Sequence, residues 1–265
     1  MLFRDIINEI KAIAIAVADF FMPRRCLVCG CRLAVSERHL CAACESDIPY
    51  TYFWMLGRNQ MADKLNAMVQ RRFEAEGLAG GSSAVGLWPY EYAAALFFYS
   101  SDAGYRKIPQ ALKYHADFPA GRRYSRRLGE RLAGSSLFSD VDMVIPVPLH
   151  WSRRWRRGYN QAEVIAREVA GALGCRMRTD LLSRPGRTRT QTRMSVEAKG
   201  RNVAHAFRCR PFSGVRHVLL VDDVFTTGAT LNACHAAVRS ALALAGISPS
   251  ECRVSVATLA YVGRP

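Results

Sequence analysis

Two adjacent acids followed by a short polar loop are the residues of this chain best suited to chemistry. Asp222 and Asp223 follow the apolar run 218–221 and precede the loop Thr226-Thr227-Gly228-Ala229-Thr230, which opens a helical pattern. A helix start offers backbone N–H groups and the positive end of its dipole to a phosphate. Gly228 permits close backbone approach, and threonine hydroxyls add donors. Carboxylates beside a phosphate site would meet hydroxyls or a metal, so the segment predicts a sugar-phosphate site. The alternative is an ordinary turn with solvated aspartates.

A second group suited to chemistry is a set of cysteines near the N-terminus. Five of the nine cysteines fall in one short window: Cys26, Cys29, Cys31, Cys41 and Cys44. Two Cys-x-x-Cys pairs, Cys26/Cys29 and Cys41/Cys44, are typical of tetrahedral Zn²⁺ coordination. Four thiolates leave no open position, so the zinc would be structural. Cys31 or His39 could replace one ligand, and a redox dithiol is the alternative to a metal site.

The charge of the chain favours anionic partners. Its formal net charge is +15, carried almost entirely by arginine. The planar arginine fork suits phosphates, so phosphorylated ligands or nucleic acid are expected, although an arginine-rich genome would give the same composition. The runs 151–157 and 121–127 interleave aromatic residues with arginine. Such runs could stack bases and follow a nucleic-acid backbone, which indicates single-stranded DNA as a partner.

Regular elements must hold these residues in place, and their alternation predicts an α/β fold with a mostly parallel sheet. The apolar patterns predict strands at 93–99, 141–147, 218–221 and 254–259, and helices at 61–73, through Tyr124 to Leu132, at 162–173 and at 229–244. In open parallel sheets ligands bind at the carboxyl ends of strands, where Asp222 and Asp223 would lie. The polar, arginine-rich stretch 183–202 suits a lid over the site. A disordered surface loop is the alternative.

The organisation along the chain separates an N-terminal module from the α/β part. Residues 1–50 hold an amphipathic helix and the cysteines, 51–104 form a connecting or hood-like segment, and 105–265 form the main domain. Acidic residues interrupt the first apolar stretch, so we expect a retained helix rather than a signal peptide. No other segment is long and apolar enough to span a bilayer, so we expect a cytoplasmic protein.

Several motifs together resemble a known family. The segment 218–230 resembles the motif of type I phosphoribosyltransferases that binds 5-phosphoribosyl-1-pyrophosphate (PRPP). The segment 144–150 looks like the strand and pyrophosphate-side loop of that family, and 157–162 follows it. Further matches are spaced through the arginine-rich stretch at Arg187, Thr190, Gln191, Met194, Arg201, Asn202 and Phe207. With the cysteine cluster, the chain is similar to the ComF/GntX family of competence-associated phosphoribosyltransferase-like proteins.

The resemblance implies a type I phosphoribosyltransferase fold and a site for PRPP with Mg²⁺. Asp222 and Asp223 would contact the ribose hydroxyls, and residues 226–230 would hold the 5-phosphate. Arg157 would neutralise pyrophosphate, so it joins the two aspartates as a catalytic candidate. Three more residues are expected to contact PRPP, namely Lys113, Gln191 and Arg201.

Two functions are compatible with these observations. The first is an enzyme, linked to competence or DNA uptake, that transfers phosphoribosyl from PRPP to an unknown acceptor and releases pyrophosphate. The second is a non-catalytic accessory protein that binds single-stranded nucleic acid or DNA-uptake proteins and retains a PRPP site. An intact Asp222–Asp223 pair with its threonine loop favours the first, because a pure DNA-binding protein has no physical need for it.

Overall fold

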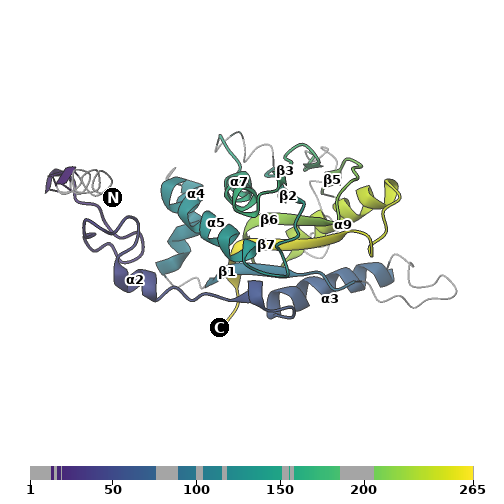
Figure 1. The fold of residues 1–265 in the computed structure, drawn as a ribbon, viewed down its shortest axis with the longest axis horizontal. Coiled ribbons are helices and arrows are strands. Elements are labelled where there is room, and N and C mark those ends of the chain that lie inside the picture. The colour runs from purple at the N-terminus through teal and green to yellow at the C-terminus, as the bar shows by residue number, and fades with distance from the viewer. Residues whose placement is uncertain are drawn as a thin grey trace, which may run out of the picture.

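A parallel sheet forms the centre of the molecule (Figure 1). The computed structural model describes residues 13–14, 17–18, 20–75, 89–99, 104–114, 118–150, 155, 158–185 and 206–264. Five parallel strands pair in the order β1-β7-β6-β2-β3. They are β1 (Ala93–Tyr99), β2 (Met143–Pro146), β3 (Arg176–Met177), β6 (His217–Phe225) and β7 (Arg253–Val262). The predicted α/β class with a mostly parallel sheet is therefore confirmed.

The central strands are apolar on both faces because helices cover both sides of the sheet. Residues 218–221 of β6 and 256–257 of β7 are almost completely buried, as are residues 93–97 of β1. Helices α5 (Phe118–Ala133) and α7 (Gln161–Leu173) pack on one face, and α3 (Gln60–Ala75) and α9 (Ala229–Leu244) pack on the other. The fold is thus a three-layer arrangement of helices, sheet and helices.

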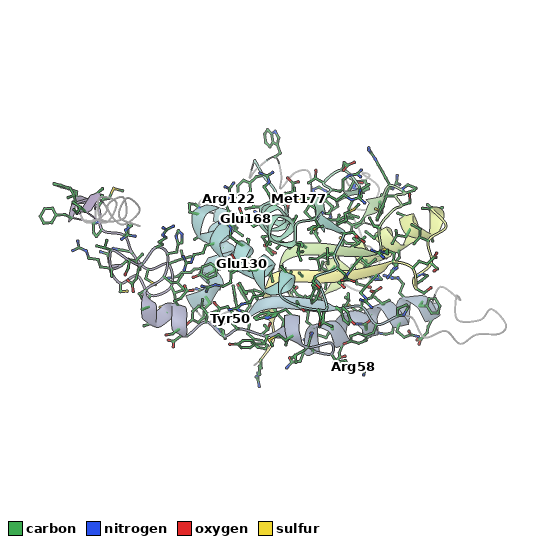
Figure 2. All side chains as sticks on the ribbon, viewed as in Figure 1. Tyr50, Arg58, Arg122, Glu130, Glu168 and Met177 are labelled. Atoms are coloured by element: carbon green, nitrogen blue, oxygen red, sulfur yellow. The ribbon has the colours of Figure 1, made fainter. Side chains whose placement is uncertain are left out.

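Helices α5 and α7 pack closely because a glycine lies where they meet. A Cβ atom on Gly129 would lie 2.7 Å from the Cβ of Ala172 and 2.9 Å from the Cα of Val169. The outward sides of the two helices carry charge: Arg122 and Glu130 of α5 and Glu168 of α7 mark this surface in Figure 2. The pair therefore contributes apolar residues to the core and a polar outer surface.

The N-terminal module lies at one end of the molecule, beside α4 (Lys107–Tyr114) and α5 (Figure 1). It contains the cysteines and the short helix α2 (Ala42–Ser46). The module joins the sheet through residues 49–51, which pair antiparallel with β1 at Tyr50 and Phe97. The short helix η1 (Phe53–Met55) follows this segment, and η2 (Gly104–Arg106) precedes α4.

One small hairpin lies outside the main sheet. Strands β4 (Leu182–Ser183) and β5 (Arg208–Cys209) pair antiparallel and pack near α9. Their pairing brings together the two ends of the arginine-rich stretch, although the predicted lid at 183–202 lies mostly outside the described residues.

The described part of the expected N-terminal helix is helical and carries large apolar side chains on its surface. Phe20, Phe21 and Met22 are 78%, 80% and 83% exposed. Among the residues that the structure describes, no helix combines the length and the apolar character needed to cross a membrane.

Candidate functional site

The order of the strands places a ligand-binding position between β2 and β6. Strand β2 pairs with β3 on one side and with β6 on the other, so the winding of the chain reverses here. Open α/β sheets bind ligands outside the carboxyl ends of the strands at such a reversal. Pairing of β2 with β6 ends at Pro146 and Val221, and the Val147 N–H donates to the Val221 carbonyl at 2.9 Å. Asp222 is therefore the first residue of β6 beyond its β2 partner.

The two aspartates extend beyond β2 on a strand that continues to pair with β7. Asp222 is opposite Thr258, and pairing continues to Phe225 and Tyr261. Both carboxylates are half-buried, and the Asp223 N–H donates to Asp222 Oδ1 at 2.9 Å. Successive strand residues face opposite sides of a sheet, so the two acids flank the end of β6. A ligand that contacts both must lie across this strand end.

The charge of Asp222 reaches the buried Cys234 of α9. Burial raises the pKa of the Cys234 thiol, and the negative charge of Asp222 raises it further.

The loop after the aspartates has the form of an anion site. Gly228 precedes the first turn of α9 with φ of +80° and has no side chain to cap it, and Thr227 Oγ1 accepts from the Ala229 N–H at 3.4 Å. A Cβ on Gly228 would lie 2.4 Å from Phe225 Cζ and 2.5 Å from Met68 Cε, so only glycine fits without rearrangement. Thr226 and Thr227 are exposed, and Thr230 is half-buried. The loop thus presents hydroxyls and helix N–H groups to an anion.

The loop between β2 and α7 is held firmly at its far end. Asn160 caps α7 by accepting from the Ala162 N–H at 3.2 Å, and its amide donates to the Val147 carbonyl at 3.0 Å. The Tyr159 hydroxyl donates to the Leu112 carbonyl of α4. Gln161 is buried, and its Nε2 has no hydrogen-bond partner among the residues described. The end of this loop, at Tyr159 and Asn160, therefore holds α4 beside the carboxyl end of β2.

Not every predicted site residue can be placed. Arg157, Gln191 and Arg201 lie outside the described residues. Lys113 lies in α4, which neighbours the β2–α7 loop, and only its backbone is described. The structure thus brings together the aspartates and the 226–230 loop, and all the predicted PRPP contacts stay predictions.

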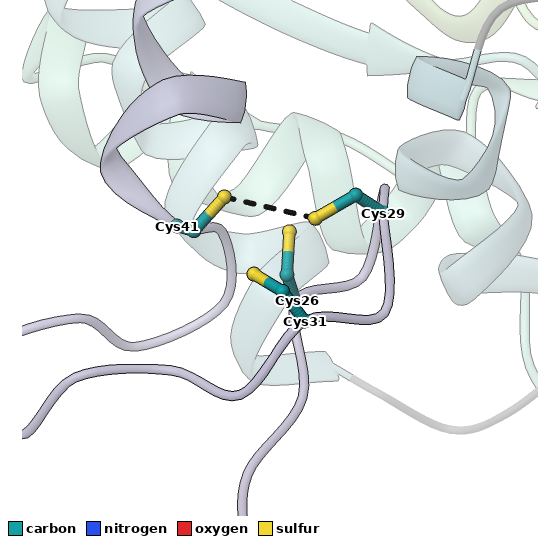
Figure 3. Close-up of side chains that lie close together, drawn as sticks. All are labelled: Cys26, Cys29, Cys31 and Cys41. Atoms are coloured by element: carbon teal, nitrogen blue, oxygen red, sulfur yellow. Dashed lines mark hydrogen bonds between the residues drawn. The ribbon is translucent and has the colours of Figure 1, made fainter.

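Four cysteine sulfurs of the N-terminal module point toward one another (Figure 3). The sulfurs of Cys26, Cys29, Cys31 and Cys41 all lie within 4.8 Å of one another, and Cys29 and Cys41 are 3.7 Å apart. A Zn–S distance of about 2.3 Å implies S···S separations of about 3.8 Å in a tetrahedron. This donor set therefore fits Zn²⁺ or a similar thiophilic ion.

The backbone of the module also favours thiolates. The first pair lies on a tight turn in which the Gly30 N–H donates to the Cys26 carbonyl at 2.9 Å and Gly30 has φ of +79°. Hydrogen bonds from the backbone N–H and thiol of Cys31 lower the pKa of Cys29 to about 6. Burial alone would raise the pKa of Cys26, yet N–H groups of neighbouring residues lower it overall. The turn is therefore preorganised to hold negative sulfur.

Cys44, the fourth predicted zinc ligand, is also close. Burial raises its pKa, and the thiols of Cys29, Cys41 and Cys26 add to that effect by direct interaction. Cys31 instead completes the set of four closest sulfurs. Five thiols are thus candidates for the four positions around one tetrahedral ion, and the choice between Cys31 and Cys44 stays open.

A buried cluster at the amino edge of the sheet escaped the sequence analysis. Glu91 accepts from His235 Nε2 at 3.1 Å, from the Val254 N–H at 3.0 Å and from Arg239. Burial alone would raise the pKa of Glu91, but hydrogen bonding to His235 and the charge of Arg239 lower it to about 2. The available signal was His235 and Arg239, four residues apart within the otherwise apolar pattern of α9.

Asp140, His217 and Ser255 are hydrogen-bonded in the order of a catalytic triad, but a substrate cannot reach them. His217 bonds Asp140 through Nδ1 at 2.7 Å and Ser255 through Nε2 at 2.8 Å. His217 is 1% and Ser255 0% exposed, so no substrate can reach the serine hydroxyl. Burial lowers the pKa of His217, so the neutral ring links strands β6 and β7 as a structural bridge.

The arginine run 121–127 lies in α5, where its aromatic residue is internal. Tyr124 is completely buried, and its hydroxyl donates to Glu45 at 2.7 Å. The expectation that this run stacks bases on its aromatic residue is therefore wrong, because helical periodicity turns Tyr124 inward while its arginines face out. In the other run only Trp155 is described, and it is 86% exposed.

Known proteins resemble part of this chain, although no family model matches it. The DNA utilization protein YhgH of Salmonella typhi is 42% identical over 92 residues, and that of Escherichia coli K12 is 38% identical over 91. Competence protein F of Haemophilus influenzae is 38% identical over 94 residues. Each match covers 34% of this chain and 40% or 41% of the relative. Over about a third of its length, the chain is thus similar to proteins named for DNA utilization and for competence.

Proposed function

We propose that this chain binds Mg²⁺-bound PRPP at the carboxyl end of β6 and transfers its phosphoribosyl group to a nitrogenous acceptor. One observation carries the proposal. Asp222 and Asp223 lie beside the glycine-led start of α9, at the point of the sheet where the winding of the chain reverses. The helix start suits the 5-phosphate, and carboxylates suit the ribose hydroxyls. One sugar phosphate satisfies both groups at once.

The reaction would break the bond between the anomeric carbon and pyrophosphate and form a bond from that carbon to nitrogen. The sugar gains positive charge, pyrophosphate leaves with its electron pair and its Mg²⁺, and the acceptor nitrogen passes a proton to solvent. Half-buried Asp222 and Asp223 are suited to hold the ribose in place during this change. Arg157 is the residue that we assign to the leaving pyrophosphate.

The names of the relatives support a role in the use of incoming DNA. We assign the chain to the ComF/GntX family on its motifs and on its similarity to proteins named for DNA utilization and competence. Reduced thiols and a PRPP substrate favour a cytoplasmic location.

Calorimetry with PRPP in the presence and absence of Mg²⁺ tests the proposal. We expect binding that requires Mg²⁺ and is displaced by pyrophosphate, followed by pyrophosphate release with one member of a panel of bases and amines. Binding without turnover on any acceptor would favour the second function, an accessory protein that retains a PRPP site. Absence of PRPP binding by folded protein would overturn both.

We also propose that the N-terminal module holds one structural zinc ion. Cys26, Cys29 and Cys41 are common to both possible sets, and the spacing favours Cys44 as the fourth ligand. Metal analysis of purified protein should give one zinc per chain, retained in Cys31→Ser and lost in Cys44→Ser. The reverse result would assign the fourth position to Cys31, and zinc-free wild-type protein would overturn the proposal.

A further inference from the structure

A deep basic recess separates the N-terminal module from α5. It has a volume of about 440 Å³, and its charged walls carry five arginines against one carboxylate, Glu130. Arg38 comes from the module, and the other four come from successive turns of α5: Arg122, Arg123, Arg126 and Arg127. Two segments that are distant in sequence thus place positive charges around the same recess.

Two further hollows, one smaller and one larger, extend this recess into a groove. A hollow of about 180 Å³ continues toward the module and shares Arg38, His39 and Arg123 with it. A hollow of about 560 Å³ continues over α7, shares Arg126 and Glu130, and adds Arg167 and Glu168. We call the three together the α5 groove. Arg122, Glu130 and Glu168 mark its course in Figure 2.

The arginines of the α5 groove divide into two groups. Arg127 pairs with Glu45 and Tyr50, whereas Arg126 and Arg122 lie 3.0 and 3.9 Å from the Glu168 carboxylate, so these three hold the structure together. Three others are exposed and, within the described residues, form no ion pair: Arg38, Arg123 and Arg167. These three come from the module, from α5 and from α7. A spaced row of exposed arginines outside direct ion pairs is the arrangement that an extended polyanion requires.

We propose that the α5 groove binds single-stranded nucleic acid through its phosphate backbone. The recesses are large enough for one sugar–phosphate chain, whereas a duplex would have to rest across their rims. Tyr124, the aromatic residue nearest these arginines in sequence, is buried under them and offers no stacking surface. Recognition therefore depends on phosphates and is insensitive to sequence. This inference goes beyond phosphoribosyl transfer and does not depend on it.

The cysteine module supplies one wall of the groove. Arg38 and His39 lie between Cys31 and Cys41, and Glu37 fixes this loop by accepting from the Ala34 and Ala42 N–H groups at 2.7 and 2.6 Å. The loop position follows from the cysteine cluster, so removing the metal should displace Arg38. Zinc loading and nucleic-acid affinity are therefore coupled.

Fluorescence anisotropy with a labelled oligothymidylate tests the proposal over a range of salt concentrations. We expect the triple variant Arg38→Gln/Arg123→Gln/Arg167→Gln to bind about tenfold more weakly or worse at moderate salt. Each lost phosphate contact on a single strand lowers the log–log salt slope by about 0.7, so the slope should fall by about 2. Chelation of zinc from the wild type should weaken binding in the same direction.

A matched control separates the groove from net charge. The variant Arg71→Gln/Arg210→Gln/Arg216→Gln removes the same charge from exposed positions outside the groove, and should bind like wild type within about twofold. The triple variant could lose affinity because its cysteine module is disturbed. The single variant Arg167→Gln excludes this cause, because Arg167 lies far from that module, and it should still bind more weakly than wild type.

Four results would overturn the proposal: no binding by wild type, equal losses in both triple variants, tighter binding of duplex than of single strand, or selective binding of an acidic protein instead. PRPP calorimetry on the groove variant should match wild type. Failure of one proposal is therefore distinguishable from failure of the other.

Discussion

At the amino edge of the sheet, Glu91 is completely buried and both carboxylate oxygens accept hydrogen bonds from His235, Arg239 and Val254. At the carboxyl edge, Asp222 and Asp223 are half-buried and lie beside the glycine-led start of α9. The same sheet thus holds one acid that is fully engaged by the protein and two that border solvent.

The two edges of the sheet therefore have different roles. A buried charge that is matched by internal donors stabilises one arrangement of strands and helices and is costly to disturb. Half-buried acids at an open edge can be reached by a ligand. Changes at the amino edge should therefore reduce stability, and changes at the carboxyl edge should reduce binding.

The largest effect is expected at the carboxyl edge, in Asp222→Asn/Asp223→Asn. Each amide keeps one acceptor oxygen but loses the charge, and charge-assisted hydrogen bonds contribute about 1.5 to 3 kcal/mol each. PRPP affinity should therefore fall by roughly two to four decades in calorimetry, if the two acids act independently. Zinc content and unfolding free energy should not fall. Wild-type affinity in this variant would show that the ribose assignment is wrong.

At the amino edge, Glu91→Gln should have the opposite profile. It leaves Arg239 buried without its carboxylate partner, and breaking such a pair costs about 3 to 5 kcal/mol. Denaturant unfolding should show this loss, while folded protein keeps wild-type affinity for PRPP. Stability equal to wild type would remove the distinction between the two edges.

Gly228→Ala, unlike the two previous variants, should reduce both stability and PRPP binding. The positive φ costs about 1 to 2 kcal/mol for a residue with a side chain, and the new Cβ meets Phe225 and Met68. Gly246→Ala is the control, since Gly246 has φ of +76° and no atom within 4 Å of an added Cβ. Only the Gly228 variant should also weaken PRPP binding. Equal losses in both would mean that backbone strain alone is responsible.

The smallest expected effect is on the pH dependence of stability. Burial lowers the pKa of His217 and of His235, although Asp140 and Glu91 oppose the shift. Below the ordinary histidine pKa of about 6.5, the unfolded chain therefore binds protons that the fold resists. The unfolding free energy should decrease as pH falls through this range. A His217→Gln/His235→Gln variant should show a flatter profile, and an unchanged slope would contradict the assignment.

The sequence predicted the apolar elements well because both faces of the sheet are covered. Helix α9 and strand β1 were predicted with the bounds that the structure has, Ala229–Leu244 and Ala93–Tyr99. Strand β6 was predicted to end at Val221 but continues to Phe225. Its polar end pairs only with β7, so no apolar alternation marks it. The two-residue strands β3, β4 and β5 are too short to give any periodicity.

The candidate site was less predictable than the fold. Asp222, Asp223 and the loop to Thr230 are contiguous in sequence, so local pattern was enough to find them. The α5 groove needs Arg38 and Arg167 beside α5, which only tertiary packing brings about. The zinc ligand set has the same difficulty, because spacing favours Cys44 whereas folding brings Cys31 into the closest group.

The segment that leaves the cysteine module has a consequence for self-association. The Phe98 N–H donates to the Pro49 carbonyl at 2.8 Å, and the Thr51 N–H donates to Leu96 at 3.1 Å, so residues 49–51 occupy the outer side of β1. An uncovered apolar edge strand is a template for pairing with other molecules. A chain cut after Thr51 would expose this row of backbone groups and tend to aggregate through intermolecular β-pairing. The connection to the N-terminal module therefore covers this part of the β1 edge and blocks edge-to-edge pairing there.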